Sequence, residues 1–131
     1  IWWDEGSPLI VLSERLQEKV AANTAVPIAL AMRYGQPSIA TGLEELHKKG
    51  IDEVLLVPLY PQHAMATTET ILVLAEEIRA KQYPNMTFTH LPAFYHHPDY
   101  IRVLSHSIQE YLQDKPWEHS EFIRKDYKHS R

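Results

Sequence analysis

The sequence contains no cysteine. A chain without thiols cannot form a disulfide framework, supply a thiolate nucleophile or ligate an iron–sulfur cluster through cysteine, so none of these is expected. Long apolar runs are also missing, because even runs such as residues 54–60 fall far below the ~20 residues that a membrane helix requires. No signal-peptide pattern opens the chain, and no initiator methionine does. We therefore expect a cytoplasmic protein without a membrane span, and a piece of a longer or processed chain.

Excess positive charge is missing too. The chain carries 13 lysines and arginines against 17 acidic residues, a formal net charge of −4. Such a surface has no general attraction for nucleic acid or for anionic membranes. Glycine is scarce, with four residues, and none forms a phosphate-binding loop, so a nucleotide ligand is not favoured. What is present is ordinary for a globular domain, and 131 residues predict one domain.

The first half of the chain predicts a helix, a strand and a second helix. Residues 6–23 are typical of a helix with Ser7 as N-cap and Pro8 at its first position, and its apolar face would consist of Leu9, Leu12, Leu16 and Val20. Residues 26–32 form an apolar run that indicates a strand covered on both faces. A second helix is predicted to begin at Pro37 and to stop at Gly50, with Ile39, Leu43 and Leu46 facing inward.

The second half continues the alternation. Residues 53–62 predict a strand with Pro58 near its carboxyl end, because proline removes a ladder donor. A helix over residues 66–82 would be capped by Thr67 or Thr68, and its apolar positions are Ile71, Leu74, Ala75 and Ile78. Residues 86–94 predict a third strand. Residues 98–113 predict a last helix, with a stripe of Ile101, Leu104, Ile108 and Leu112.

Strands that alternate with helices indicate an α/β fold, here an open, doubly wound, three-layer, mostly parallel sheet with helices on both faces. The series opens on a helix that should follow a strand, so we expect the first strand of the sheet to be missing. The two sheet edges left without a partner would favour self-association. We expect a partial α/β domain over residues 1–114 and a polar C-terminal extension over residues 115–131.

Ligands of open α/β sheets bind beyond the carboxyl ends of the strands, which here means the loops at 33–36, 60–68 and 92–97. Arg33 offers a planar fork for a carboxylate, although a helix-capping role is an equal alternative. Hydroxyls of Thr67, Thr68 and Thr70, together with unpaired helix N-terminal amides, favour an anionic group at the same edge. Tyr34 and Tyr60 are either packing residues or ligand contacts.

The sequence has eight histidines, most of which are interpreted as structural. His63, His90 and His96 fall in or next to the predicted loops and could converge at the sheet edge. Neutral imidazoles gathered there would suit a transition metal. These three are the candidate metal ligands.

Three strings, "IWWDEGSPL", "ALAMRYGQPSI" and "VPLYPQHAMATTET", resemble the ferrochelatase family, and the resemblance covers about residues 1–113. Enzymes of this family insert ferrous iron into protoporphyrin IX. The resemblance implies a chelatase-like fold, these two substrates and no further cofactor. It implies that Ser7 lies near a porphyrin propionate and that Arg33, Tyr34 and Tyr60 line the porphyrin cleft. Thr67 and Thr68 match the family's paired threonines.

The sequence also departs from the family's pattern. His63 and Ala64 stand where a tyrosine and a serine are usual, and Glu69 stands where a glycine is usual. Met65 occupies the position of a cluster-ligating cysteine, so no iron–sulfur cluster is expected. The family's catalytic histidine and its partner glutamate belong to a second half-domain whose patterns are absent here. No catalytic residue is therefore assigned, and His119 and His129 are not given that role.

Three functions remain open at this point. The chain is a portion of a ferrochelatase that alone binds porphyrin weakly or is inactive, a non-catalytic porphyrin- or heme-binding module, or a small homodimeric chelatase similar to the cobalt chelatases. The last of these would need His63 or His90 as its active histidine.

Overall fold

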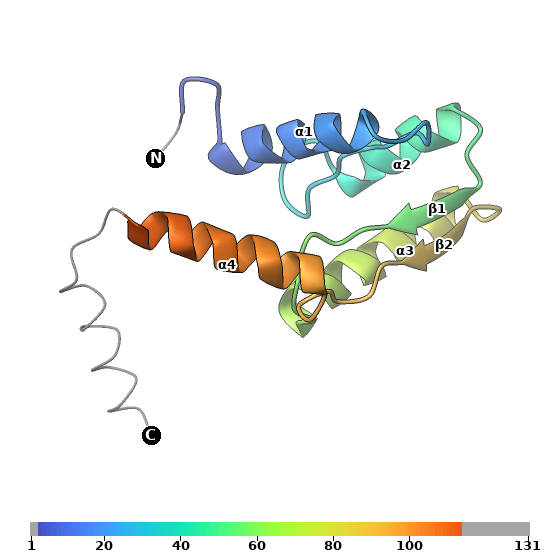
Figure 1. Cartoon of the computed structure of the whole chain (residues 1–131). Coiled ribbons are helices and arrows are strands. Elements are labelled where there is room, and N and C mark those ends of the chain that lie inside the picture. The colour runs from blue at the N-terminus through green and yellow to red at the C-terminus, as the bar shows by residue number, and fades with distance from the viewer. Residues whose placement is uncertain (1–2, 114–131) are drawn as a thin grey trace. The chain divides into compact units, whose positions relative to one another are not determined.

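A computed structural model describes residues 3–113 of the chain (Figure 1). Along the sequence it contains α1 (Pro8–Ala21), α2 (Ile39–Lys48), β1 (Glu53–Leu56), a π-helical turn η1 (Met65–Glu69), α3 (Thr70–Gln82), β2 (Thr87–His90) and α4 (Pro98–Gln113). The chain separates into two compact units, Ile1–Pro92 and Ala93–Arg131. The predicted extension 115–131 lies outside the described residues.

The sheet of the first unit is small and parallel, which confirms the α/β prediction. β1 and β2 pair in register from Glu53 with Thr87 to Leu56 with His90. Two further bonds extend the ladder, from Thr87 N–H to the Asp52 carbonyl at 2.7 Å and from Leu91 N–H to the Leu56 carbonyl at 2.9 Å. Helix α3 connects the two strands, as a parallel pair requires. Both strands are shorter than predicted, since β1 ends before Pro58 and β2 ends at His90.

The predicted strand at residues 26–32 is not formed, which corrects the sequence interpretation. In the described part of the chain the segment makes a single bridge, between Met32 and Ser38, in which Met32 N–H donates to the Pro37 carbonyl at 2.7 Å. An apolar run becomes a strand only when a neighbour supplies ladder hydrogen bonds. Residues 26–31 have no such neighbour among the described residues, so their sequence pattern alone does not make them a strand.

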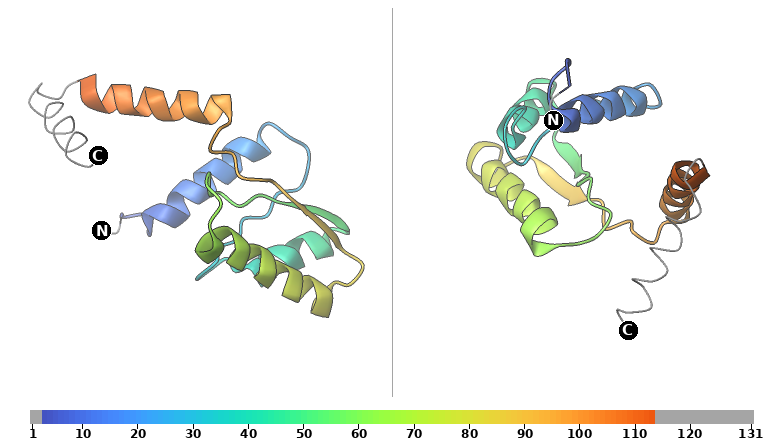
Figure 2. Two further views of the ribbon diagram at one scale, coloured as in Figure 1. Left: turned by 90° about the horizontal axis from the view of Figure 1, so that it is seen from below. Right: turned by 90° about the vertical axis from the view of Figure 1, so that its left-hand side faces the viewer.

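The core of the first unit lies where α2 and α3 meet β1 (Figure 2). Its buried members are Ile39, Leu43, Leu46, Val54, Ala75 and Met86. The three inward positions predicted for α2 are all among them. Ile71, Leu74 and Ile78 of α3 are partly buried and pack against this cluster, so the predicted apolar face of that helix is confirmed as well.

Helix α1 turns a different face inward from the one predicted. Val11 is its buried residue, whereas Leu9, Leu12, Leu16 and Val20 remain between 43% and 64% exposed. Helical periodicity identifies side chains that share a face, but burial needs an element to cover that face. No described element covers the leucine stripe of α1. The helix is joined to the segment that follows it by Gln17, whose amide donates to the Ile28 carbonyl at 3.2 Å.

Local start and stop signals are partly confirmed. Ser7 and Pro8 do begin α1, although the Ser7 side chain makes no capping hydrogen bond. Helix α2 begins after Ser38, whose hydroxyl accepts the Thr41 N–H at 3.1 Å, and the cis peptide Gln36–Pro37 precedes it. Gly50 follows the end of α2 with φ +75°, as the predicted stop requires.

The described part of the second unit consists mainly of α4, which has the predicted bounds 98–113. None of its residues is buried, and the predicted stripe of Ile101, Leu104, Ile108 and Leu112 is between 38% and 52% exposed. The periodic pattern therefore forms the helix, although no residue of α4 is buried in the described part of the chain. Within residues 3–113, no helix has the length and hydrophobicity needed to cross a membrane.

Candidate functional site

The loop that follows residues 26–31 positions Arg33 and Tyr34. It is closed by the bond between Met32 N–H and the Pro37 carbonyl, and Gly35 turns the chain with φ +80°. The guanidinium carbon of Arg33 lies 4.6 Å from the centre of the Tyr34 ring. Tyr34 is 79% exposed, so this aromatic ring lies at the surface with a cation against one face.

Arg33 carries unused hydrogen-bonding capacity. Its Nε atom is buried and has no partner, and no carboxylate pairs with the guanidinium anywhere in residues 3–113. A buried N–H without a partner costs free energy in the folded state, and a carboxylate ligand would remove that cost. Arg33 makes no helix-capping hydrogen bond within residues 3–113, and its anion-binding role stays a prediction.

The loop after β1 has a different geometry from the one predicted. Its π-helical turn begins at Met65, and the Ala64 carbonyl accepts the N–H groups of Thr67, Thr68 and Glu69 at 3.2, 2.9 and 3.5 Å. Thr67 and Thr68 are therefore not N-caps, and their amides are not available to an anion. The Thr70 hydroxyl is also engaged, since it donates to the Thr67 carbonyl at 2.9 Å.

Thr68 in the π-helical turn and Ser7 before α1 each have a side-chain hydroxyl that makes no hydrogen bond in the described residues. Thr68 is 8% exposed, and its Oγ1 atom is buried without a partner. Ser7 is half-buried at the start of α1, where its hydroxyl is not used as a cap. Tyr60 is 38% exposed and follows the buried Pro58. These hydroxyls and the Tyr60 ring are the groups for which ligand contacts are predicted from the sequence, and no hydrogen bond joins the three residues to one another within residues 3–113.

The three candidate histidines have separate surroundings. His63 Nε2 lies 3.2 Å from Glu69 Oε1, a contact across the π-helical turn. His90 ends β2 at the surface, and His96 belongs to the second unit. Across residues 3–113, no three side chains of the metal-ligating types come together. Convergence of the three histidines therefore remains a prediction.

The partner of His63 was missed by sequence reasoning. Glu69 lies six residues further on, a spacing that brings side chains together on neither a helix nor a strand. The signal that could have found it is the pair of unusual positions, His63 and Glu69, within one short loop.

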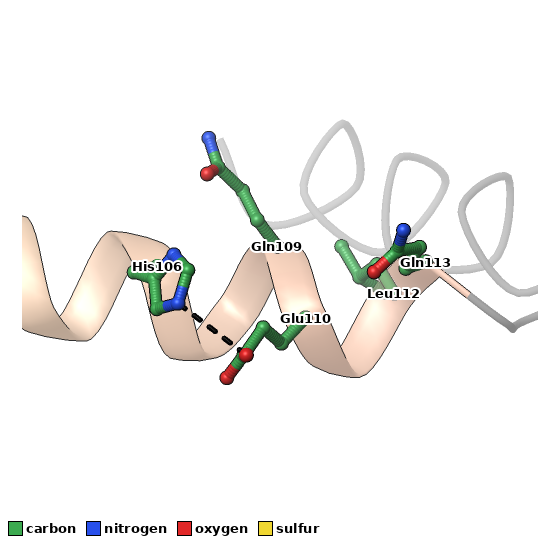
Figure 3. A pocket seen from close by; sticks show the side chains of 5 residues that line it. All are labelled: His106, Gln109, Glu110, Leu112 and Gln113. Carbon is green, nitrogen blue, oxygen red and sulfur yellow. Dashed lines mark ion pairs between the residues drawn. The ribbon is translucent and has the colours of Figure 1, made fainter.

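A second His–Glu contact lies on α4 (Figure 3). His106 Nε2 is 3.3 Å from Glu110 Oε1, one helical turn away, and both side chains line a surface hollow with Gln109, Leu112 and Gln113. All five come from one helix, and none is a predicted binding residue. We therefore do not assign the candidate site to this hollow.

Comparison with known proteins identifies relatives along most of the chain. The family model described as Ferrochelatase matches residues 1–127. The ferrochelatase of Ectopseudomonas mendocina (strain ymp) is 46% identical over 114 residues, which are 86% of this chain and 34% of that protein. The ferrochelatase of Pseudomonas paraeruginosa (strain DSM 24068 / PA7) is 47% identical over 120 residues, 91% of this chain and 35% of that protein. The chain thus spans about a third of the length of the curated relatives it matches.

Proposed function

The chain belongs to the ferrochelatase family, and we propose that it is a portion of an enzyme that inserts ferrous iron into protoporphyrin IX. In this proposal the described residues supply part of the porphyrin-binding surface. The observation that carries it is Arg33, whose buried Nε has no partner and whose guanidinium lies against the exposed ring of Tyr34.

Porphyrin chemistry explains why this arrangement is useful. Protoporphyrin IX is a flat apolar ring with two carboxylates on one rim, so its binding site needs aromatic walls and a few donors for the carboxylates. Arg33 can donate to a carboxylate while Tyr34 faces the ring edge. Ser7 and Thr68 have unused hydroxyls, Thr67 stands beside Thr68, and Tyr60 adds a second ring. We assign these six residues to porphyrin binding.

Metal insertion also requires removal of two pyrrole protons as iron enters the ring. We propose no catalytic base in this chain, so that the chain alone binds porphyrin weakly and accelerates insertion little or not at all. Ferrous iron and protoporphyrin IX are substrates, and no iron–sulfur cluster is assigned. A small homodimeric cobalt chelatase is not favoured, because the relatives at 43% to 47% identity are ferrochelatases.

A titration with protoporphyrin IX tests this function directly. We expect a saturable change in the Soret absorbance of the porphyrin, and after anaerobic addition of ferrous iron we expect insertion no faster than in a protein-free control. Absence of saturable binding would contradict the porphyrin-binding role. Insertion clearly faster than the control would contradict the absence of a catalytic base.

Self-association belongs to the proposal as well. β1 pairs with β2 along one edge, and Leu55 of β1, together with Val57 and Leu59 just after the strand, is between 48% and 58% exposed. An apolar strand with an unpaired edge is a template for another strand. We propose that two copies of the chain can associate through β1. A cytoplasmic location and the absence of a nucleic-acid partner also remain predictions from the sequence.

A further inference from the structure

The contact between His63 and Glu69 has the geometry of a supported metal ligand. An ionised carboxylate has no hydrogen to donate, so His63 Nε2–H is the donor and Glu69 Oε1, 3.2 Å away, is the acceptor. This assignment leaves the lone pair on His63 Nδ1, an atom without a hydrogen-bond partner in residues 3–113. The two side chains are 55% and 46% exposed, so water and a dissolved ion can reach the ring.

The backbone between the two residues is held in place. The Ala64 carbonyl accepts N–H groups from three successive residues, Thr67, Thr68 and Glu69. The Thr70 hydroxyl fixes the end of the turn by donating to the Thr67 carbonyl. These main-chain hydrogen bonds therefore place Glu69 close to His63. Single π-helical turns of this kind are frequent at functional sites.

Imidazole nitrogen is a suitable ligand for divalent first-row metals such as Fe²⁺ and Co²⁺. Histidines that bind metals usually donate their other ring N–H to a carboxylate, which fixes the tautomer and makes the free nitrogen a better ligand. The contact between His63 and Glu69 is of this type. We infer that His63 Nδ1 is a docking ligand for the divalent metal substrate, with Glu69 as the residue that positions the ring.

This inference rests on the proposed function for the identity of the metal as substrate, and it adds where that substrate first contacts the chain. No third metal-ligating side chain joins the pair in the described residues, so water fills the rest of the coordination shell. Docking is a ligand exchange in which Nδ1 displaces one bound water, without a redox or covalent step. A site with one protein ligand binds weakly and releases quickly, as an ion that must be passed on requires.

His106 and Glu110 on α4 provide a matched control (Figure 3). Their contact also joins a histidine Nε2 to a glutamate Oε1, at 3.3 Å. However, the two side chains are 70% and 67% exposed, and they lie one turn apart on a regular helix and not in a π-helical turn. If any His–Glu contact were sufficient, both places would bind metal equally. The inference requires the loop to bind at lower metal concentration than the helix.

The test is a nuclear magnetic resonance titration of the ¹⁵N-labelled chain with Co²⁺, an air-stable paramagnetic substitute for Fe²⁺. We expect paramagnetic shifts and broadening for amides of residues 60–69 before those of α4. His63→Ala should abolish the response of the loop, Glu69→Gln should weaken it by about tenfold, and His106→Ala should leave it unchanged. A loop response that persists in His63→Ala, or an equal response on α4, would overturn the inference.

Porphyrin titrations of the same samples separate this inference from the proposed function. Unchanged porphyrin affinity in His63→Ala, with the Co²⁺ response lost, supports metal docking by His63. Loss of porphyrin affinity in the folded variant would make His63 a porphyrin contact and overturn the docking role. A wild-type chain that shows the Co²⁺ response in its loop but binds no porphyrin would sustain the metal site and refute the proposed function.

Discussion

Arg33 and Tyr34 are neighbours in sequence whose side chains stack, with 4.6 Å between the guanidinium carbon and the centre of the ring. Gly35, with φ +80°, turns the chain immediately after them. The stacking leaves the edge of the guanidinium to form hydrogen bonds, and Nε has none in the described structure. Arg33 thus combines a stacked guanidinium with an Nε–H donor that has no partner in the described structure.

Arg33→Lys should weaken porphyrin binding. Lysine keeps the charge but loses the planar fork, and loss of one charged hydrogen bond of about 1.5 kcal/mol corresponds to about a tenfold rise in Kd. The Soret titration measures it. Arg15→Lys is the control, because Arg15 also lies against an aromatic ring, that of Trp3 at 5.9 Å, and already has a carboxylate partner in Glu5. Equal Kd values for Arg33→Lys and the wild type would refute the role of the fork.

Thr68→Val should stabilise the chain when no ligand is present. Valine has nearly the same shape and removes a buried hydroxyl that has no partner, so we expect the free energy of unfolding to rise by about 1 kcal/mol. Thr67→Val is the comparison, since the Thr67 hydroxyl donates to the Ala64 carbonyl at 3.4 Å and its loss should not stabilise. Chemical denaturation measures both. A less stable Thr68→Val chain would show that the hydroxyl has a partner.

Gly42 should tolerate little added volume. A Cβ atom there would lie 3.3 Å from the Ala31 Cβ and 3.8 Å from the Ala29 Cβ. Gly42→Leu should lower the free energy of unfolding by about 1–3 kcal/mol because it overpacks this contact. Gly42→Ala should change it much less, since the gain in helix propensity opposes the tight contact. Denaturation curves that coincide for the leucine variant and the wild type would refute the close approach.

Acid should remove a stabilising contribution of Glu76. Arg79 donates to both carboxylate oxygens of Glu76, at 2.8 and 2.5 Å, and these hydrogen bonds hold the pKa of the Glu76 carboxyl below its ordinary value. A lowered folded-state pKa adds stability above the unfolded pKa of about 4.3, and this stability is lost as pH falls through the folded value.

Denaturation midpoints between pH 7 and pH 3 test this linkage. The wild type should be more stable than Glu76→Gln at neutral pH, and the difference should shrink on acidification. Glu77→Gln makes the same change of charge one residue away, at a position with no ion pair in residues 3–113, and should not reproduce the effect. A difference between wild type and Glu76→Gln that is constant with pH would be evidence against it.

Leu55→Lys should reduce self-association of the chain. Lysine on a strand edge disfavours pairing with a second strand. Val73→Lys is the matched control, because Val73 has the same 58% exposure but lies on α3. Sedimentation velocity over a range of concentrations should show dimer for the wild type and Val73→Lys, and mainly monomer for Leu55→Lys. Dimer in all three would exclude the edge of β1 as the interface.

The sequence was most informative where structure depends on local pattern. The bounds of α4 and the stop at Gly50 follow from periodicity and backbone preference. The strand at 26–32 could not be decided this way, because a strand depends on a partner distant in sequence. The prediction that Leu12 and Ile108 would be buried was wrong for the same reason. Each lies on an apolar stripe of its helix, but in the described part of the chain each stays 52% exposed.

The candidate site divides along similar lines. The place of Arg33 and Tyr34 after an apolar run predicts a binding role for them, and the structure adds that their side chains stack. The expectation that Thr67 and Thr68 open a helix with free amides was wrong, because one carbonyl, that of Ala64, takes those amides. The contact of His63 with Glu69 depends on a π-helical turn, which no simple periodicity predicts.

The absence of a side chain at Gly42 has a consequence for how a larger sheet could assemble. The backbone of α2 approaches Ala29 and Ala31 closely enough to restrict them, although residues 29–31 make no backbone hydrogen bond in the described structure. A segment ordered in this way has already lost conformational entropy, worth about 1 kcal/mol or more per residue. A strand that later paired with it would not have to order both partners. A helix can thus prepare a sheet edge before any ladder forms.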